Sequence, residues 1–322
     1  MSSHRHDIDD LVRRARQGQA RAVARLISLV EDGAPDLRAL AAALARYTGR
    51  AQVVGITGAP GVGKSSTVSV LITALRAAGK KIGVLAVDPS SPFSGGALLG
   101  DRVRMQDHAT DSGVFIRSMA TRGHLGGTAW ATPQAVRVLD AAGCDVVVVE
   151  TVGVGQSEVE VLALADTVVV LLAPGMGDGI QAVKAGILEV ADVFVVNKAD
   201  REGSDQTVRD LKYMISLGRR GTAGPSWRPP IVRTVATRSE GIEDLLTAIE
   251  EHQRWALRHG ELDARRQRRA EAEVEAIALA QLRAKLGDLR RGSALSGLAK
   301  RVVVGELDVY RAADELIAEL GA

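Results

Sequence analysis

The segment that most constrains the fold is Gly58-Ala59-Pro60-Gly61-Val62-Gly63-Lys64-Ser65, which matches the pattern GxxxxGK[ST]. An apolar run at 52–57 precedes it and helix-forming residues at 68–72 follow it, as a phosphate-binding loop between a strand and a helix requires. The glycines let backbone N–H groups turn towards a phosphate, and the N-terminus of the following helix adds positive potential. Lys64 can then reach the β- and γ-phosphates of a nucleotide, and the Ser65 hydroxyl can ligate magnesium.

Short apolar, β-branched runs alternate with helical patterns between residues 51 and about 258. The expected strands are Gln52–Thr57, Lys81–Asp88, Val114–Arg117, Asp145–Glu150, Thr167–Ala173, Asp192–Asn197 and Ile231–Ala236. Several runs are apolar throughout, which is typical of strands covered on both faces. The alternation predicts an α/β fold with a mostly parallel, doubly wound sheet, and such sheets bind ligands at the carboxyl ends of their strands.

A second motif, Asn197-Lys198-Ala199-Asp200, ends the run at 192–197. One carboxylate can accept hydrogen bonds from both N1–H and the N2 amine of guanine, whereas adenine would leave a buried Asp200 unpaired. Asn197 can bond the base edge and brace the loop, while the stem of Lys198 can lie along the ring. Ala236, after the last run, is placed so that its backbone amide could meet the guanine oxygen. The motif therefore favours GTP over ATP.

Three carboxylates lie at the ends of predicted strands or on a glycine-containing loop: Glu150, Asp88 and Asp101. In a GTPase, an acid at the position of Glu150 bonds the water shell of the metal, and a glycine amide three residues on, here Gly153, meets the γ-phosphate. We therefore expect these acids to hold magnesium or orient water. Another glycine-rich segment, 175–181, lies at a strand end, where it could move with nucleotide state or form an ordinary turn.

The position after the switch glycine, where Ras-like enzymes place a water-orienting glutamine, is Val154, and the nearest glutamine is Gln156. This predicts slow intrinsic hydrolysis that a partner or second subunit accelerates. Candidate charge-stabilising residues are Arg102, Arg104 and Arg122.

Both ends of the chain have helical patterns. An apolar stripe from Ile8 to Val30 ends at Gly33-Ala34-Pro35, and a second helix follows to about Gly49. We expect three parts: a helical N-terminal extension (1–50), a nucleotide-binding domain (51–258) and a C-terminal helical arm (259–322). The arm should contain a stripe from Val274 to Leu289 and a helix at 307–320. A cluster of four arginines near its start, Arg265, Arg266, Arg268 and Arg269, fits either a solvated helix face or a phosphate or partner contact.

Composition excludes several classes of function. The formal net charge is only +2 and aromatic residues are 3%, so nothing favours nucleic acid as a partner. A single cysteine excludes a disulfide framework and suits the cytoplasm. No apolar run approaches the length of a membrane helix, and the N-terminus lacks the apolar region of a secretory signal, so we expect no membrane contact.

The segments GAPGVGKSS, VDPSSPFSGGALLGDRVRM, ETVGVGQSE and NKAD occur in this order and together resemble the MeaB/ArgK/MMAA family of P-loop GTPases. The resemblance covers nearly the whole chain. It implies a SIMIBI-class G domain and a homodimer formed through the C-terminal helices. It also implies a GTP-dependent chaperone of methylmalonyl-CoA mutase, which gates adenosylcobalamin loading and protects or reactivates the mutase. The loop around Asp178, Gln181 and Lys184 matches a third switch in this family.

The motifs and the resemblance together give three sets of expected site residues. The residues expected to contact GTP or GDP are Gly58, Ala59, Pro60, Gly61, Val62, Gly63, Lys64, Ser65, Ser66, Gly153, Asn197, Lys198, Asp200 and Ala236. Those expected to hold Mg²⁺ are Ser65, Asp88, Asp101 and Glu150. Those expected to take part in hydrolysis are Lys64, Asp101 and Glu150.

Two other functions remain open. A metallochaperone GTPase would carry a His-rich tract or a CxC or CxxC metal site, and this chain has neither. A kinase of a periplasmic amino-acid-binding protein, which the ArgK name suggests, needs an acceptor site, and no separate acceptor-binding domain is visible.

Overall fold

A computed structural model describes most of the chain. The described residues are 2–33, 36–89, 108, 110–121, 127–151, 162–175, 190–217, 226–291 and 293–318. Only the backbone is described at 2–6, 88–89, 120–121, 127–130, 283–291 and 293–294.

A parallel sheet of seven strands organises this part of the chain, in the order β3-β2-β4-β1-β5-β6-β7. The strands are β1 (Gln52–Gly58), β2 (Ile82–Pro89), β3 (Val114–Thr121), β4 (Val146–Thr151), β5 (Thr167–Leu172), β6 (Val193–Asn197) and β7 (Ile231–Thr234). All seven predicted strands are confirmed, with bounds shifted by a few residues, and so is the predicted α/β fold.

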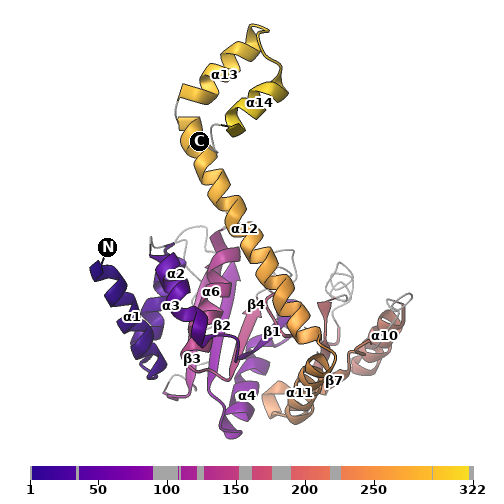
Figure 1. The fold of residues 1–322 in the computed structure, drawn as a ribbon. Helices are drawn as coiled ribbons and strands as arrows, with labels where there is room; N and C mark the ends of the chain where they lie inside the picture. Colours follow the sequence, from indigo (N-terminus) through magenta and orange to yellow (C-terminus); the bar gives the residue numbers. More distant parts are fainter. Residues whose placement is uncertain are drawn as a thin grey trace. The chain divides into compact units, whose positions relative to one another are not determined.

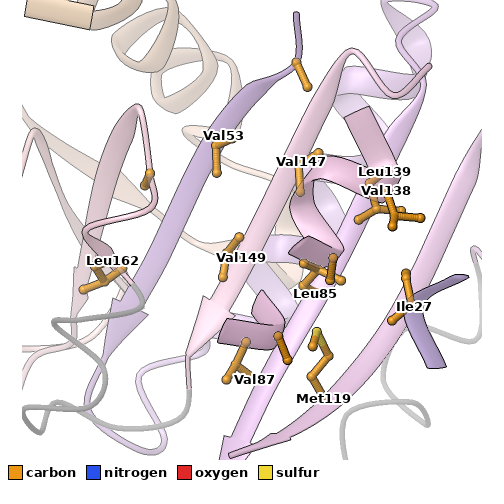
Figure 2. Packing of buried hydrophobic residues seen from close by; sticks show 14 of the residues in the cluster. Ile27, Val53, Leu85, Val87, Met119, Val138, Leu139, Val147, Val149 and Leu162 are labelled. Atoms are coloured by element: carbon orange, nitrogen blue, oxygen red, sulfur yellow. The ribbon is translucent and has the colours of Figure 1, made fainter. Parts of the chain in front are cut away.

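Helices cover both faces of the sheet (Figure 1). Four of them follow strands: α4 (Lys64–Ala77), α6 (Gly127–Ala141), α10 (Ser204–Leu217) and α11 (Ile242–Arg258). One apolar cluster packs α6 and α10 against one face, and a second packs α4 and α11 against the other. Figure 2 shows the first cluster, to which three neighbouring strands contribute Val53, Val147 and Leu85 and α6 contributes Leu139. Because every residue of β1, β4, β5 and β6 is buried, these strands read as continuous apolar runs.

The N-terminal segment adds α1 (Ser2–Arg16), α2 (Ala20–Glu31), α3 (Leu37–Leu44) and the 3₁₀ turn η1 (Ala45–Tyr47) to the first face. The single apolar stripe predicted from Ile8 to Val30 is divided into two helices. Gly18, at φ +82°, ends α1, because its N–H bonds Ala15 and the N–H of Gln19 bonds Arg14. These two bonds form a Schellman motif, which turns the chain without interrupting the apolar stripe.

Aspartates stand directly before three strands at the amino edge of the sheet. Asp145, Asp166 and Asp192 each accept a hydrogen bond from the backbone N–H of a residue in or beside a neighbouring strand: Lys81 at 2.7 Å, Val53 at 3.0 Å and Val168 at 2.8 Å. The carboxylates therefore satisfy N–H groups at the sheet edge.

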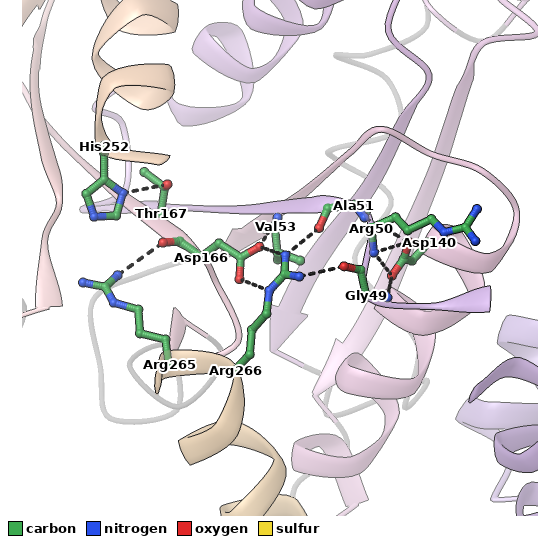
Figure 3. A network of polar contacts seen from close by, with 10 residues as sticks. All are labelled: Gly49, Arg50, Ala51, Val53, Asp140, Asp166, Thr167, His252, Arg265 and Arg266. Atoms are coloured by element: carbon green, nitrogen blue, oxygen red, sulfur yellow. Dashed lines mark hydrogen bonds and ion pairs between the residues drawn. The ribbon is translucent and has the colours of Figure 1, made fainter. Parts of the chain in front are cut away.

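Two arginines at the start of α12 (Glu261–Arg291) complete this edge (Figure 3). Arg265 binds both oxygens of Asp192 at 2.7 and 2.8 Å, and Arg266 binds Asp166 at 2.7 Å. Arg266 also donates to the carbonyl oxygens of Gly49 and Ala51. For Arg265 and Arg266, the interpretation of the basic cluster as a solvated helix face is therefore wrong, because both guanidinium groups bind carboxylates of the same unit.

The contacts divide the chain into two units, Met1–Arg266 and Gln267–Ala322. The first unit contains the sheet, its helices and the first residues of α12. The second contains the rest of α12 together with α13 (Ser293–Val303) and α14 (Val309–Ala318), which pack against each other. The apolar pattern of the sequence does not separate α13 from its neighbours. No helix in the described residues is long and apolar enough to span a membrane.

Candidate nucleotide-binding site

The centre of the sheet brings the predicted motifs together. β1 pairs with β4 on one side and β5 on the other, so the chain leaves β1 at the point where the sheet order diverges. The register places Ile56 opposite Glu150 and Gly58 opposite Leu171. The loop after β1 therefore lies at the carboxyl edge, where doubly wound sheets bind ligands.

The backbone of this loop needs its glycines. Gly58, Gly61 and Gly63 have φ angles of +150°, +80° and +98°, which L side chains rarely adopt. A Cβ at Gly58 would collide with the carbonyl oxygen of Leu171, and one at Gly63 would collide with the amide nitrogen of Asn197. Gly61 has open space around it, so only its φ angle calls for glycine.

Lys64 is the first residue of α4, and its side chain folds back over the loop. It is buried, and its Nζ donates to the carbonyl oxygens of Gly58 at 2.8 Å and Ala59 at 3.2 Å. These bonds hold a positive charge against the glycine loop, beside the N-terminus of a helix. Both features favour an anion such as a phosphate.

Ser65 joins the loop to β4. Its Oγ donates to Glu150 Oε1 at 2.8 Å, and both side chains are buried. Beside them, Thr151 Oγ1 donates to Thr57 Oγ1 at 2.9 Å, a buried pair that the sequence analysis missed. A hydroxyl and a carboxylate next to a phosphate loop are oxygen ligands of the kind that Mg²⁺ prefers. Within the described residues, no group of three or more His, Cys, Asp or Glu side chains is placed to hold a metal ion.

Asn197, the last residue of β6, braces the loop from two strands away in the sheet. Its Nδ2 donates to the Val62 carbonyl at 2.8 Å, and its Oδ1 accepts from Thr234 Oγ1 and from the backbone N–H of Ala236, both at 3.1 Å. The bracing predicted for Asn197 is present in this structure. The same bonds tie the end of β7 to the loop, and no periodic pattern indicated the part played by Thr234.

Lys198 and Asp200 follow Asn197 at the site. Lys198 has a positive φ of 57°, and its Nζ donates to the Gly61 carbonyl at 2.6 Å. This places its aliphatic stem across the mouth of the loop. The Asp200 carboxylate is partly exposed and accepts from Arg238 at 3.2 Å. Sequence reasoning did not identify Arg238, because a lone arginine in a short turn gives no signal.

The remaining predicted site residues are placed only in part. Ser66 is exposed in the first turn of α4, and Pro60 is exposed in the loop. Asp88 lies at the carboxyl end of β2, where only the backbone is described. Asp101, Gly153, Val154, Gln156 and the arginines at 102, 104 and 122 lie outside the described residues, as do Asp178, Gln181 and Lys184.

A phosphate loop after the central strand and an NKxD motif at the end of a second strand, on one parallel sheet, define a P-loop GTPase. A family model described as methylmalonyl Co-A mutase-associated GTPase MeaB matches residues 23–289. The chain belongs to this family.

Individual relatives support this family assignment. A protein of Pyrococcus abyssi named as a GTPase is 48% identical over 97% of each chain. The GTPase ArgK of Escherichia coli is 39% identical over 74% of this chain and 73% of its own. The mouse methylmalonic aciduria type A homolog, a mitochondrial protein, is 40% identical over 66% of this chain and 52% of its own. Among solved structures, one described as a LAO/AO transport system kinase superposes with a TM-score of 0.71 at 27% identity and covers 98% of both chains.

Proposed function

We propose that this chain binds and slowly hydrolyses GTP, and that its nucleotide state controls a chaperone activity towards methylmalonyl-CoA mutase. In this role it gates adenosylcobalamin loading and protects or reactivates the mutase. The observation that carries the proposal is the joining of the two nucleotide motifs in one site, where Asn197 of the NKxD segment donates to Val62 of the phosphate loop. The description of the family, which names the mutase, supports the partner.

The residues present fit the expected magnesium ion. The buried pair of Ser65 Oγ and Glu150 Oε1 offers hard oxygen ligands beside the phosphate loop. We assign Ser65, Glu150, Asp88 and Asp101 to holding the ion. Magnesium, when bound, neutralises charge on the phosphate oxygens.

The chain's own groups do the rest of the binding. Backbone N–H groups of residues 58–66 hold the phosphates, and Lys64 supplies a fixed positive charge against them. Asp200 accepts from N1–H and the N2 amine of guanine, with Lys198 lying along the ring and the backbone of Ala236 near the base oxygen. This set selects GTP because adenine would leave the Asp200 carboxylate unpaired.

The switch depends on the γ-phosphate. The backbone N–H of Gly153 meets that group, while Lys64, Asp101 and Glu150 stabilise charge or orient water during hydrolysis. The loop around Asp178 and Gln181 changes arrangement when the phosphate leaves. A partner senses this change only by binding the two arrangements with different affinities. Turnover is slow because Val154 replaces the water-orienting glutamine of Ras-like enzymes.

The C-terminal helices are the proposed homodimer interface. Several large apolar side chains of the second unit are exposed: Val303, Val304, Val309, Tyr310 and Ile317. Apolar surface of this kind is typical of a covered interface. The proposal also places the protein in the cytoplasm, in keeping with its single cysteine.

A pull-down tests the partner directly. Immobilised chain is incubated with the host's methylmalonyl-CoA mutase in GDP or in a non-hydrolysable GTP analogue. We expect the mutase to be retained, in amounts that differ between the two nucleotides. The control is the Lys64→Ala variant, which should lose the difference. Equal retention in both nucleotides, or none in either, would refute the chaperone role while leaving GTP hydrolysis intact.

A second candidate, protein kinase activity, rests on the description of the solved structure that covers 98% of this chain. Incubation with γ-labelled GTP and a periplasmic amino-acid-binding protein distinguishes the two. Label on the binding protein supports the kinase, and label released only as inorganic phosphate supports the GTPase.

A further inference from the structure

A cavity of about 620 Å³ lies within the first unit, at the amino edge of the sheet. Its lining includes the first residues of β1 and β4, the last turn of α4 and one side of α11. The phosphate loop follows the other end of β1, so this cavity is separate from the nucleotide site. Its volume falls in the range of small-molecule pockets.

Aliphatic side chains form much of the wall. They are Val54, Leu71, Leu75, Val146, Leu246 and Ile249. Five of these six are buried. Such a wall favours an apolar body over water, because a buried water needs two to four polar partners.

One buried polar group lines this cavity with nothing to bond. Gln52 is only 8% exposed, and its Nε2 has no hydrogen-bond partner among the residues that the structure describes. Its backbone N–H, in contrast, is bonded to the Asp145 carbonyl. The Nε2 atom itself is sealed from solvent, so the amide must turn about its last side-chain bond to face the cavity. Because an unmet buried donor costs free energy, this turn is favoured by a ligand that brings an acceptor oxygen.

The side chains at the mouth are mainly basic. Arg16, Arg50, Lys80 and Arg254 all line the cavity and are exposed. Arg16 is held in place by Tyr47, whose ring centroid lies 3.7 Å from the guanidinium carbon.

Two of the three acids in the lining accept hydrogen bonds from backbone N–H groups. Asp140 accepts from the backbone N–H groups of Gly49, Arg50 and Ala51, and Asp145 accepts from that of Lys81 (Figure 3 shows the contacts of Asp140). Asp145 and Glu250 are exposed acids at the mouth, and with Asp140 the lining has three acids against four basic side chains. The lining therefore carries an excess of one positive charge, which favours an anion over a cation.

We propose that this cavity binds a small organic anion with an apolar body and a carboxylate or phosphate group. The body packs on the aliphatic wall, an acceptor oxygen takes the Gln52 Nε2–H, and the basic mouth balances the charge. The site is independent of the function proposed above.

Titration calorimetry on the full chain tests this with sodium hexanoate, hexyl phosphate and 1-hexanol, which share one apolar body. Saturating GDP and Mg²⁺ are present so that the phosphate loop cannot take the probes. We expect one anion per chain, bound about tenfold more tightly than the neutral alcohol. Whichever anion binds more tightly identifies the headgroup.

Three variants locate the binding. Gln52→Leu removes the donor and should weaken binding of the better anion about tenfold without lowering the melting temperature. Leu246→Trp fills the cavity and should abolish binding. Gln206→Leu, at an exposed glutamine whose Nε2 bonds Asp210, is the matched control and should change nothing.

Failure of both anions to bind would overturn the proposal, because Gln52 would then be a structural orphan or water-bonded. Unchanged affinity in Gln52→Leu would also overturn it, even if Leu246→Trp failed to fold.

Discussion

At the scale of single residues, Lys64 carries the largest share of the proposed phosphate affinity. Its Nζ is held at the loop by the Gly58 and Ala59 carbonyls, so little ordering is needed when phosphate binds. Lys64→Ala should weaken GDP binding about tenfold to a hundredfold, the worth of a hydrogen bond to a charged group. Fluorescence titration with labelled GDP measures this. The exposed Lys212→Ala is the control, and unchanged affinity in Lys64→Ala would contradict the assignment.

Asp200 is the residue proposed to select the base. In Asp200→Asn, an amide donates where the carboxylate accepted, so affinity should shift from guanine to xanthine nucleotides, with a loss of about a hundredfold for GDP. Competition between GDP and XDP provides the measurement. Arg238→Gln removes the 3.2 Å contact to Asp200 but keeps the carboxylate, and this control should retain the guanine preference. Full GDP affinity in Asp200→Asn would show that another group reads the base.

At the scale of elements, the glycines of the phosphate loop are required for two different reasons, a positive φ angle and a lack of space for a side chain. Gly61→Ala and Gly63→Ala both place a side chain at positive φ, which costs about 1–2 kcal/mol. Only the Cβ at 63 would also strike Asn197 and disturb its bond to Val62. We therefore expect Gly63→Ala to lose more stability and more nucleotide affinity than Gly61→Ala. Urea unfolding and GDP titration check this, and equal losses would show that the Asn197 brace carries no energy.

The ion pairs of Asp166 and Asp192 with Arg266 and Arg265 form a network at the amino edge of the sheet, here called the edge network. Its contribution to the free energy of unfolding depends on pH. Burial raises the pKa of Asp192, but contacts with His252 and Arg265 outweigh this effect and hold it below its ordinary value of 3.8. A depressed pKa means that the stabilisation is complete above about pH 4 and is lost as the pH falls through the folded value. Asp192→Asn should therefore cost about 3 kcal/mol at pH 7, and the deficit should shrink below pH 4.

Urea unfolding from pH 7 to pH 3 tests this expectation. The control, Asp10→Asn, breaks an exposed contact with Arg13 and should cost no more than about 0.5 kcal/mol at any pH. A deficit for Asp192→Asn that stays constant with pH would mean that the ionised carboxylate is not what stabilises the edge.

The apolar runs in the sequence were enough to predict the strands. The tendency of parallel sheets to bind ligands at the carboxyl ends of their strands was enough to bring Ser65 together with Glu150, 85 residues away. They were not enough for the arginines of α12. Arg266 meets Asp166 across 100 residues, and neither residue belongs to a periodic pattern. Gly18 was missed for a different reason, because the apolar stripe of α1 and α2 continues across the turn.

At the scale of the whole molecule, the boundary between the two units falls inside one helix. α12 begins at Glu261, yet Arg265 and Arg266 belong to the unit that contains the sheet. A cut between domains at residue 258, where the sequence pattern changes, would remove both arginines. It would leave Asp166 and Asp192 buried without these partners.

Two truncated chains therefore separate stability from assembly. A chain ending at Arg266 keeps the edge network and should unfold in urea close to the full chain, whereas one ending at Arg258 should lose about 3 kcal/mol or more. If the C-terminal helices form the proposed homodimer, light scattering should find a dimer for the full chain and monomers for both truncations. A dimeric 1–266 chain would place the interface on the first unit instead. Equal unfolding midpoints for the two truncations would show that the arginines of α12 add nothing to the fold.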